Sequence, residues 1–212
     1  MKKTIKYNDQ VRQRSVKGEN SAYGILLAAE NLLIDEGYHN FSLRKVAARA
    51  EQTLGSLQYY FPTKQALVKA MLDNYIQRYL DMFVQIRTQA GDDAEDQFRA
   101  LILGIVGDLN SRTTTMFFPE VWSMANHDKN VAVSMDAMYG QYRAVLVEVI
   151  NQINPKLSPQ QLTRLAVYIS ASLEGQTMFI GHGKPWKMET ANIISMATQS
   201  FLWLIRSGEV PA

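Results

Sequence analysis

The sequence predicts an all-α protein of about nine helices. Strand-like alternation of apolar and polar residues is absent, apolar residues recur at helical spacing, and glycine and proline fall mainly between the periodic segments. The chain has 212 residues, of which 47% are hydrophobic. This is enough to bury a core in one large or two small domains.

The first predicted helix covers about residues 21–36. Its apolar face consists of Ile25, Ala28, Ala29, Leu32 and Leu33. Gly37 follows directly and is well placed to close the helix as a left-handed residue, with Tyr38 folding back on Leu33.

Two very short helices come next. One covers about residues 42–50, where Phe41 precedes the cap and can pack on Val46 as a hydrophobic staple. The other covers about residues 53–61 and is stopped by Pro62. Two helices separated by three or four residues fit a helix-turn-helix.

A long helix is predicted over residues 63–90, ending at Gly91. Its apolar residues at helical spacing are Leu67, Met71, Tyr75, Tyr79, Met82, Phe83 and Ile86. At about 1.5 Å per residue it would span roughly 40 Å. We therefore expect this helix itself, and not a loop, to link two bodies.

The remaining helices begin with more usual signals, such as the acids Asp92, Asp93 and Glu95 at the next helix start. Further helices are expected near residues 113–126, 129–153, 158–181 and 189–206. Pro119 interrupts the first of these, and Ser158, with proline after it and Gln161 at the third position, forms a strong start signal.

We predict three segments: a basic flexible arm at residues 1–20, a helix-turn-helix domain at 21–66, and a larger helical ligand-binding and dimerisation domain at 67–212. Positive charge is concentrated at the start of the chain. Six Lys or Arg and one acid occur in residues 1–17, whereas twelve basic and fourteen acidic residues follow from Gln65 onward.

Cations also stand where a helix start normally carries acids. Arg44 and Lys45 follow the cap residue Ser42, and Lys64 follows the cap residue Thr63. A third cap, Thr53, has no acid behind it. Backbone N–H donors next to cations are how a protein holds phosphates, so double-stranded DNA is the expected partner.

The helix at 53–61 would lie in the major groove and present its early residues to the bases. The residues available for this are Leu54, Gly55, Ser56, Gln58, Tyr59 and Tyr60. Gln58 can pair with adenine through two hydrogen bonds, and the tyrosines can donate to phosphates or pack on thymine methyls. The alternative is a compact helical domain with an ordinary amphipathic surface.

Residues 21–71 resemble the amino-terminal domain of the TetR family of transcriptional repressors. The matching residues are Ala28, Ala29, Leu32, Leu33, Gly37, Ser42, Leu43, Arg44, Val46, Ala47, Gly55, Leu57, Tyr59, Tyr60, Phe61, Lys64 and Leu67. The resemblance implies that Ser42, Thr53, Tyr59, Tyr60 and Lys64 anchor phosphates. It also implies that Arg44, Ser56 and Gln58 reach bases, in a homodimer on a pseudo-palindromic operator.

Three positions depart from the family pattern. Glu51 stands where a glycine usually closes the second helix; either the backbone is left-handed there, at roughly 1–2 kcal/mol, or the turn is rebuilt. Leu54 replaces a common basic residue, and Gln58 replaces a common aromatic. Basic residues of the arm, such as Arg12 or Arg14, would supply the lost charge in a minor groove. Deleting residues 1–17 should then weaken operator binding and flatten its salt dependence.

The last two long helices are candidates for dimerisation. Their apolar stripes contain Leu165, Ile169, Leu173, Ile194, Phe201, Leu202 and Ile205. Ordinary intramolecular core is the alternative for these stripes. The family resemblance implies that the two helices build a four-helix dimer interface.

The middle of the chain is rich in methionine and aromatic residues, which suit a permissive apolar pocket. The candidate ligand-binding residues are Met116, Phe117, Trp122, Met138, Tyr142, Met178, Phe179 and Trp186. By resemblance this region would bind a small inducer, either apolar or, through cation–π contact with Trp122 or Trp186, cationic. Core packing is the alternative for any single residue.

Other classes of protein find less support. There is no cysteine, no secretory signal and no apolar run of membrane-spanning length, so we expect a cytoplasmic protein. His39, His127 and His182 lie far apart, and no phosphate-binding or nucleophile motif occurs, so neither an enzyme, a metal site nor a cofactor is predicted. A helical carrier without DNA binding would leave Arg44, Lys45 and Lys64 without a purpose.

Overall fold

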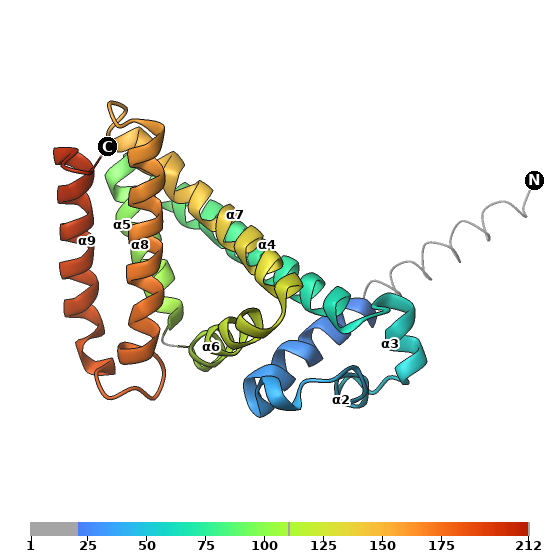
Figure 1. The fold of residues 1–212 in the computed structure, drawn as a ribbon. Helices are drawn as coiled ribbons and strands as arrows, with labels where there is room; N and C mark the ends of the chain where they lie inside the picture. The colour runs from blue at the N-terminus through green and yellow to red at the C-terminus, as the bar shows by residue number, and fades with distance from the viewer. Residues whose placement is uncertain (1–20, 110, 212) are drawn as a thin grey trace, which may run out of the picture. The chain divides into compact units, whose positions relative to one another are not determined.

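The computed structural model describes residues 21–109 and 111–211. These residues form helices and connecting loops, with no strand among them (Figure 1). Residues 21–36 are helical and are followed by η1 (Tyr38–Asn40), α2 (Leu43–Arg49), α3 (Leu54–Tyr60), α4 (Lys64–Ala90), α5 (Ala94–Leu109), α6 (Arg112–His127), α7 (Lys129–Ile153), α8 (Pro159–Ile180), η2 (Lys187–Glu189) and α9 (Thr190–Ser207). The predicted all-α fold class is confirmed, whereas the predicted arm at residues 1–20 lies outside the described residues.

The chain forms two compact units. Within the described residues, the first unit runs to Asn74 and includes Glu120–Ala132, and the second consists of Tyr75–Pro119 together with the residues from Val133 onward. Helix α4 therefore contributes its first part to one unit and the rest to the other. Helix α6 is divided in the same way, directly after its internal proline, Pro119.

The first unit is built around side chains that the amphipathic pattern of the sequence places inward. Its fully buried residues include Ile25, Ala29, Leu33, Val46, Leu57, Leu67 and Met71. Gly37 follows the helix of residues 21–36 with the expected positive φ of 72°, but its ψ of 173° is extended, so the predicted left-handed closing residue is not formed. Tyr38 then donates its backbone N–H to Glu120 Oε2 at 2.7 Å, which ties this loop to the second half of α6 within the same unit.

The second unit contains α5, α8 and α9, which pack against one another; Figure 1 shows α8 and α9 side by side. Helix α8 begins with the predicted capping box, in which Ser158 accepts from Gln161 N and Gln161 accepts from Ser158 N. Arg206 of α9 pairs with Glu95 of α5, and this pairing lowers the pKa of Glu95. Caps and ion pairs thus fix the ends of helices whose middles are held by apolar packing.

The apolar stripes of α8 and α9 face into the protomer. Six of the seven candidate dimerisation residues have exposed fractions of 2% or less, and Ile194 is half-buried. The buried six are Leu165, Ile169, Leu173, Phe201, Leu202 and Ile205. A buried side chain cannot touch a partner, so any dimer contact through these helices must use their other, exposed faces.

Candidate DNA-binding surface and ligand cavity

Helix α2 begins as the sequence predicts. Ser42 caps it by accepting from Lys45 N at 3.3 Å, and no acid occurs in the first turn. Arg44 is exposed and has no ion pair among the described residues. Lys45 is also exposed, but its Nζ lies 2.8 Å from Glu36 Oε2 and 3.0 Å from Asn40 Oδ1. Such an exposed pair is weak, so Lys45 can exchange it for a phosphate.

The turn after α2 is closed by a left-handed Glu51, with φ of 54°. Gln52 N donates to Ala47 O at 2.9 Å and Glu51 N to Ala48 O at 3.2 Å, which is the double hydrogen bond of a Schellman motif. The glycine expected at this point is therefore replaced without rebuilding the turn. The strain of a non-glycine residue, roughly 1–2 kcal/mol, is retained in the native state.

Helix α3 is capped by Thr53, which accepts from Ser56 N at 3.1 Å. Leu57 is fully buried and attaches the helix to the first unit. Gln58 and Tyr59 project outward on the opposite side, and 82% of Tyr59 is exposed. These two side chains are therefore free to meet a groove.

The other candidate residues of α3 are less free. Ser56 is half-buried and donates its hydroxyl to Gln52 Oε1 at 2.8 Å, so a base contact would have to break this bond. Leu54 and Tyr60 are half-buried, while Gly55 is exposed. Among the residues of this helix, Gly55, Gln58 and Tyr59 are the most accessible.

Lys64 stands at the start of α4, where Thr63 caps the helix by accepting from Ala66 N at 3.0 Å. Its Nζ lies 4.5 Å from the centre of the Tyr38 ring and 5.4 Å from that of Phe41. Partial burial lowers the pKa of Lys64, and the charge of Asp128 offsets part of this effect. The ammonium is thus held in place by two rings, and it has no ion pair within the part of the chain that the structure describes.

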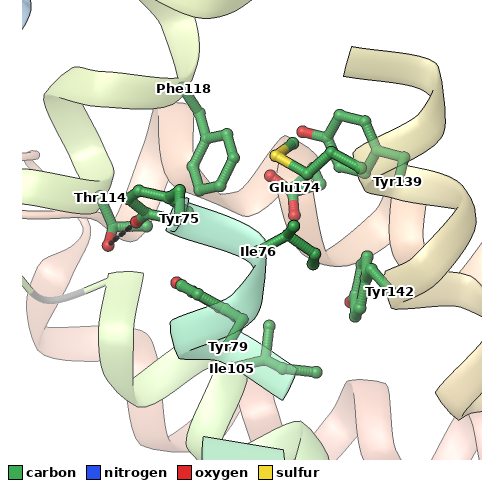
Figure 2. A pocket seen from close by; sticks show the side chains of 10 residues that line it. Tyr75, Ile76, Tyr79, Ile105, Thr114, Phe118, Tyr139, Tyr142 and Glu174 are labelled. Carbon is green, nitrogen blue, oxygen red and sulfur yellow. Dashed lines mark hydrogen bonds between the residues drawn. The ribbon is translucent and has the colours of Figure 1, made fainter. Parts of the chain in front are cut away.

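A cavity that is partly open to solvent lies in the second unit. It is lined by Tyr75, Ile76 and Tyr79 of α4, Ile105 of α5, Thr114 and Phe118 of α6, Met138, Tyr139 and Tyr142 of α7, and Glu174 of α8. These residues come from five helices, and Figure 2 shows their side chains gathered around one space. The space between these side chains is about 410 Å³, and part of it is open to solvent. The centre of a water molecule could occupy only about 20 Å³ of this space. An occupant must therefore be compact.

Aromatic side chains form half of the lining of this cavity, and their rings contact one another. Neighbouring ring centres are 5.2 Å apart for Tyr75 and Tyr79, 5.8 Å for Tyr79 and Phe83, 5.9 Å for Phe83 and Tyr142, 6.4 Å for Tyr142 and Tyr139, 6.3 Å for Tyr139 and Phe118, and 5.3 Å for Phe118 and Tyr75. The six contacts form a closed circuit. Five of the six residues line the cavity, and Phe83, which does not, links Tyr79 to Tyr142. We call these six residues the aromatic ring of the cavity.

Two polar groups of the cavity remain unsatisfied. Glu174 is half-buried as a residue, but its Oε2 is enclosed and has no hydrogen-bond partner within the described part of the chain. Burial raises the pKa of Glu174 to about 7, against the effect of a hydrogen bond from Tyr139. The hydroxyl of Tyr142 also lacks a described partner, and burial raises its pKa.

A satisfied network lies beside them. The hydroxyls of Tyr79 and Thr114 both donate to Asp108 Oδ2, and Tyr75 and Thr114 share a hydrogen bond of 3.2 Å, drawn as a dashed line in Figure 2. Burial and the Asp108 charge raise the pKa of Tyr79. This network fixes the orientation of two of the six rings.

Of the eight candidate ligand-binding residues, Met138 and Tyr142 line this cavity. Phe117 is fully buried behind it, with its ring stacked 4.5 Å from that of Tyr75. Trp122 belongs to the first unit, and the other four are exposed: Met116, Met178, Phe179 and Trp186. The cation–π contact expected from Trp122 or Trp186 thus has no counterpart at this cavity.

The other eight lining residues were not among the predicted ligand-binding residues: Tyr75, Ile76, Tyr79, Ile105, Thr114, Phe118, Tyr139 and Glu174. Tyr75 and Tyr79 were visible as neighbours four apart on one face of the long helix, and Tyr139 and Tyr142 are three apart. An acid directly beside the apolar stripe of α8, at Glu174, was the remaining signal. Such an acid usually faces solvent. Only the structure shows that the Glu174 side chain lines the cavity together with residues of α4 and α7.

A capped short helix with an exposed polar face, placed after a tight turn in an all-helical protein, defines a helix-turn-helix DNA-binding protein. Comparison with known proteins agrees. The tetR family of bacterial regulatory proteins matches residues 25–71. A helix-turn-helix transcriptional regulator from the dhlA 5′ region of Xanthobacter autotrophicus is 31% identical over 151 residues, covering 70% of this chain and 71% of that protein. The chain belongs to the TetR family of transcriptional regulators.

Solved structures show the same fold. A transcriptional regulator from Rhodococcus sp. Rha1 aligns with a TM-score of 0.71 at 18% identity, covering 90% of this chain and 99% of that one. A TetR-family regulator from Mesorhizobium loti MAFF303099 aligns with a TM-score of 0.72 at 14% identity, covering 88% and 97%. The homologues are regulators and not enzymes, and no helix in residues 21–109 or 111–211 has the length and apolarity needed to cross a bilayer.

Proposed function

We propose that this regulator is a cytoplasmic homodimeric repressor that leaves a pseudo-palindromic operator when a small apolar or cationic inducer binds. The observation that carries the proposal is the exposed surface of α2 and α3, where Arg44, Gly55, Gln58 and Tyr59 project beside three helix starts that lack acids. Backbone N–H groups and cations at these starts suit phosphates, and the amide of Gln58 suits a base edge.

Dimerisation is supported by the outer faces of α8 and α9. Their large exposed apolar residues are Val167, Tyr168, Met178, Phe179, Met196 and Trp203. Apolar groups gathered on two adjacent helices favour a protein partner, and a second copy would supply the second recognition helix that half-sites about 34–36 Å apart require.

Release by an inducer is supported by the cavity in the second unit. Its lining includes Tyr75, Ile76 and Tyr79 of α4, the helix whose first residues belong to the DNA-binding unit. A ligand that prefers one orientation of α4 would change the separation of the two recognition helices in a dimer. Operator and inducer would then exclude each other through their preference for different states.

Titration of labelled duplex DNA from upstream of the chain's own gene tests the proposal. We expect salt-dependent binding that Arg44→Ala weakens by about tenfold, as for a contact worth 1–2 kcal/mol. Arg99→Ala, which removes an exposed arginine of α5, is the matched control and should bind as tightly as the wild type. Equal weakening by both variants, or no affinity for duplex DNA at low salt, would refute the assignment of this surface.

A further inference from the structure

We propose that the cavity binds a small organic ammonium ion, with Glu174 as its counter-ion beside the aromatic side chains of the lining. This inference rests on the proposed inducer response and names the chemical class of the inducer. It is carried by the enclosed Glu174 Oε2, which lacks a partner among the described residues, and by the five aromatic side chains that line the same cavity.

The unsatisfied oxygen selects the charge of the occupant. A carboxylate oxygen only accepts hydrogen bonds, and a buried acceptor without a partner is destabilising. An apolar occupant would leave Glu174 Oε2 as it is, and an anion would meet repulsion from both Glu174 and Asp108, whose charge already acts on Glu174. A cation removes the penalty, and an N–H donor would also supply the missing bond.

The rings select for an organic cation. Aromatic faces attract ammonium groups, most strongly where water is excluded. Two of these rings already have a cation nearby, since Arg78 lies 5.0 Å from the Tyr75 centre and Arg143 lies 5.9 Å from the Tyr139 centre. Alkyl substituents on nitrogen would fill the apolar space between Ile76, Ile105 and Met138.

Among the charged and titratable groups near the cavity, Glu174 is the one available to pair with a bound cation. Helix α4 contributes Tyr75, Tyr79 and Arg78, α5 contributes Asp108, and α7 contributes Tyr139, Tyr142 and Arg143. The α6 residues of the lining, Thr114 and Phe118, are uncharged. No lining residue carries a positive charge, and Asp108 is engaged by Tyr79 and Thr114.

A rival interpretation gives the opposite pH dependence. With its pKa near 7, Glu174 could instead stay protonated and donate to a neutral carbonyl or hydroxyl ligand. A neutral ligand would then bind more tightly below pH 7. An ammonium ion needs the carboxylate, so its affinity should rise with pH up to about 8 and should fall by as much as tenfold per pH unit below 7.

The test is calorimetric titration of the full-length protein with three compact probes. These are 2,2-dimethylpropylammonium, tetramethylammonium and the uncharged 2,2-dimethylpropan-1-ol, which matches the first in shape. We expect both cations to bind at pH 8 at least about tenfold more tightly than the alcohol, because charge pairing and cation–π attraction are lost together in the alcohol. At pH 7, titrations in buffers of different ionisation enthalpy should reveal proton release on cation binding. Tighter binding of the first cation than of the second would show that the N–H donor contributes beyond charge.

Three variants distinguish the loss of the Glu174 charge from a loss of folded structure. Glu174→Gln should lower affinity for both cations by at least about tenfold and remove the pH dependence, while Asp136→Asn, which neutralises an exposed acid of α7, should change neither. Tyr139→Leu should weaken cation binding by removing a ring. Circular dichroism of each variant establishes that it is folded.

The inference is overturned if the alcohol binds as tightly as the cations, if Glu174→Gln has no effect, or if affinity rises as pH falls. It is also overturned if none of the three probes binds to protein that still binds operator DNA. Release of that operator by a different, neutral compound would then leave the proposed function standing. Conversely, cation binding by protein that ignores duplex DNA would remove the proposed function and keep the ammonium site.

Discussion

Glu174 couples the stability of the ligand-free protein to pH. Its pKa is about 7 in the folded protein, against 4.5 for a solvated glutamate, so the folded state binds this proton more tightly. The stabilisation is complete below pH 4.5 and is lost as the pH rises through 7. Each pKa unit corresponds to about 1.4 kcal/mol, which sets an upper limit of about 3 kcal/mol for the loss between pH 5 and 8.

Glu174→Gln should therefore raise the free energy of unfolding at pH 8 while leaving it nearly unchanged at pH 5. Urea denaturation of both proteins at the two pH values measures this, and subtraction removes the contribution of the surface acids Glu95 and Glu148, whose pKa values are lowered by arginines. A difference between the two proteins that does not vary with pH would mean that Glu174 is not a buried titrating group.

Glu51 offers a second test at the scale of one residue. Glu51→Gly should raise the free energy of unfolding by about 0.5–1 kcal/mol, because relief of left-handed strain exceeds the extra flexibility that glycine gives the unfolded chain. Thermal and urea denaturation measure the change. The neighbouring exposed Ala48, which lies inside α2, serves as the control, since Ala48→Gly should destabilise by about 1 kcal/mol.

Single-residue predictions succeeded where the local backbone decides. The caps at Ser42, Thr53 and Ser158 follow from which groups a helix end leaves unpaired, and all three are confirmed. Gly37 has the predicted positive φ but an extended ψ of 173°. The orientation of the Glu174 side chain toward the cavity cannot be predicted from its neighbours in sequence. It depends on tyrosines that lie more than thirty residues away along the chain.

At the scale of the element, α3 is a helix whose stability and DNA affinity can be separated. Thr53→Asp keeps a side-chain acceptor at the cap and adds a negative charge that favours the helix start. The same charge repels phosphate. We expect stability equal to or above that of the wild type, with DNA affinity lowered by tenfold or more in dilute salt.

The matched control is Ser158→Asp, which makes an equivalent change at the cap of α8 in the second unit. It should preserve both stability and DNA affinity. Thr53→Ala completes the set, because loss of the cap should lower stability by about 1 kcal/mol. Unchanged DNA affinity in Thr53→Asp, measured by fluorescence anisotropy, would show that the α3 start does not approach phosphate.

Helix positions were predictable from the sequence to within about two residues, because apolar periodicity and caps are local properties. The role of a stripe was harder to predict. On α8 and α9 the most apolar stripe packs inside the protomer, and the exposed Phe179 and Trp203 lie outside it. Each of these two helices therefore has a buried apolar face and exposed apolar residues outside it. In both helices the apolar residues that recur at regular helical spacing form the core.

At the scale of the whole molecule, dimerisation should depend on these exposed faces. Trp203, of which 56% is exposed, and Phe179, of which 63% is exposed, are suitable positions for a charge. Trp203→Glu or Phe179→Glu should shift the protein from dimer to monomer, since two copies of the charge would meet across a two-fold axis. Operator affinity should fall by at least about a hundredfold, because one recognition helix remains per molecule.

Light scattering after size-exclusion chromatography measures the mass of each variant. Val133→Glu places the same charge at an exposed apolar position of α7 and should remain dimeric. If all three variants keep the mass of the wild type, or if the wild type itself is monomeric, α8 and α9 are not the dimer surface.

Pro119 is the position at which α6 bends most easily. A proline cannot donate a backbone hydrogen bond to the carbonyl four residues earlier, so bending of a helix concentrates at that peptide. On one side of it Phe118 closes the aromatic ring of the cavity, and on the other Glu120 holds the amide of Tyr38. A bend at Pro119 would thus leave intact both the helical turn that carries Phe118 and the turn whose Glu120 holds the loop before α2.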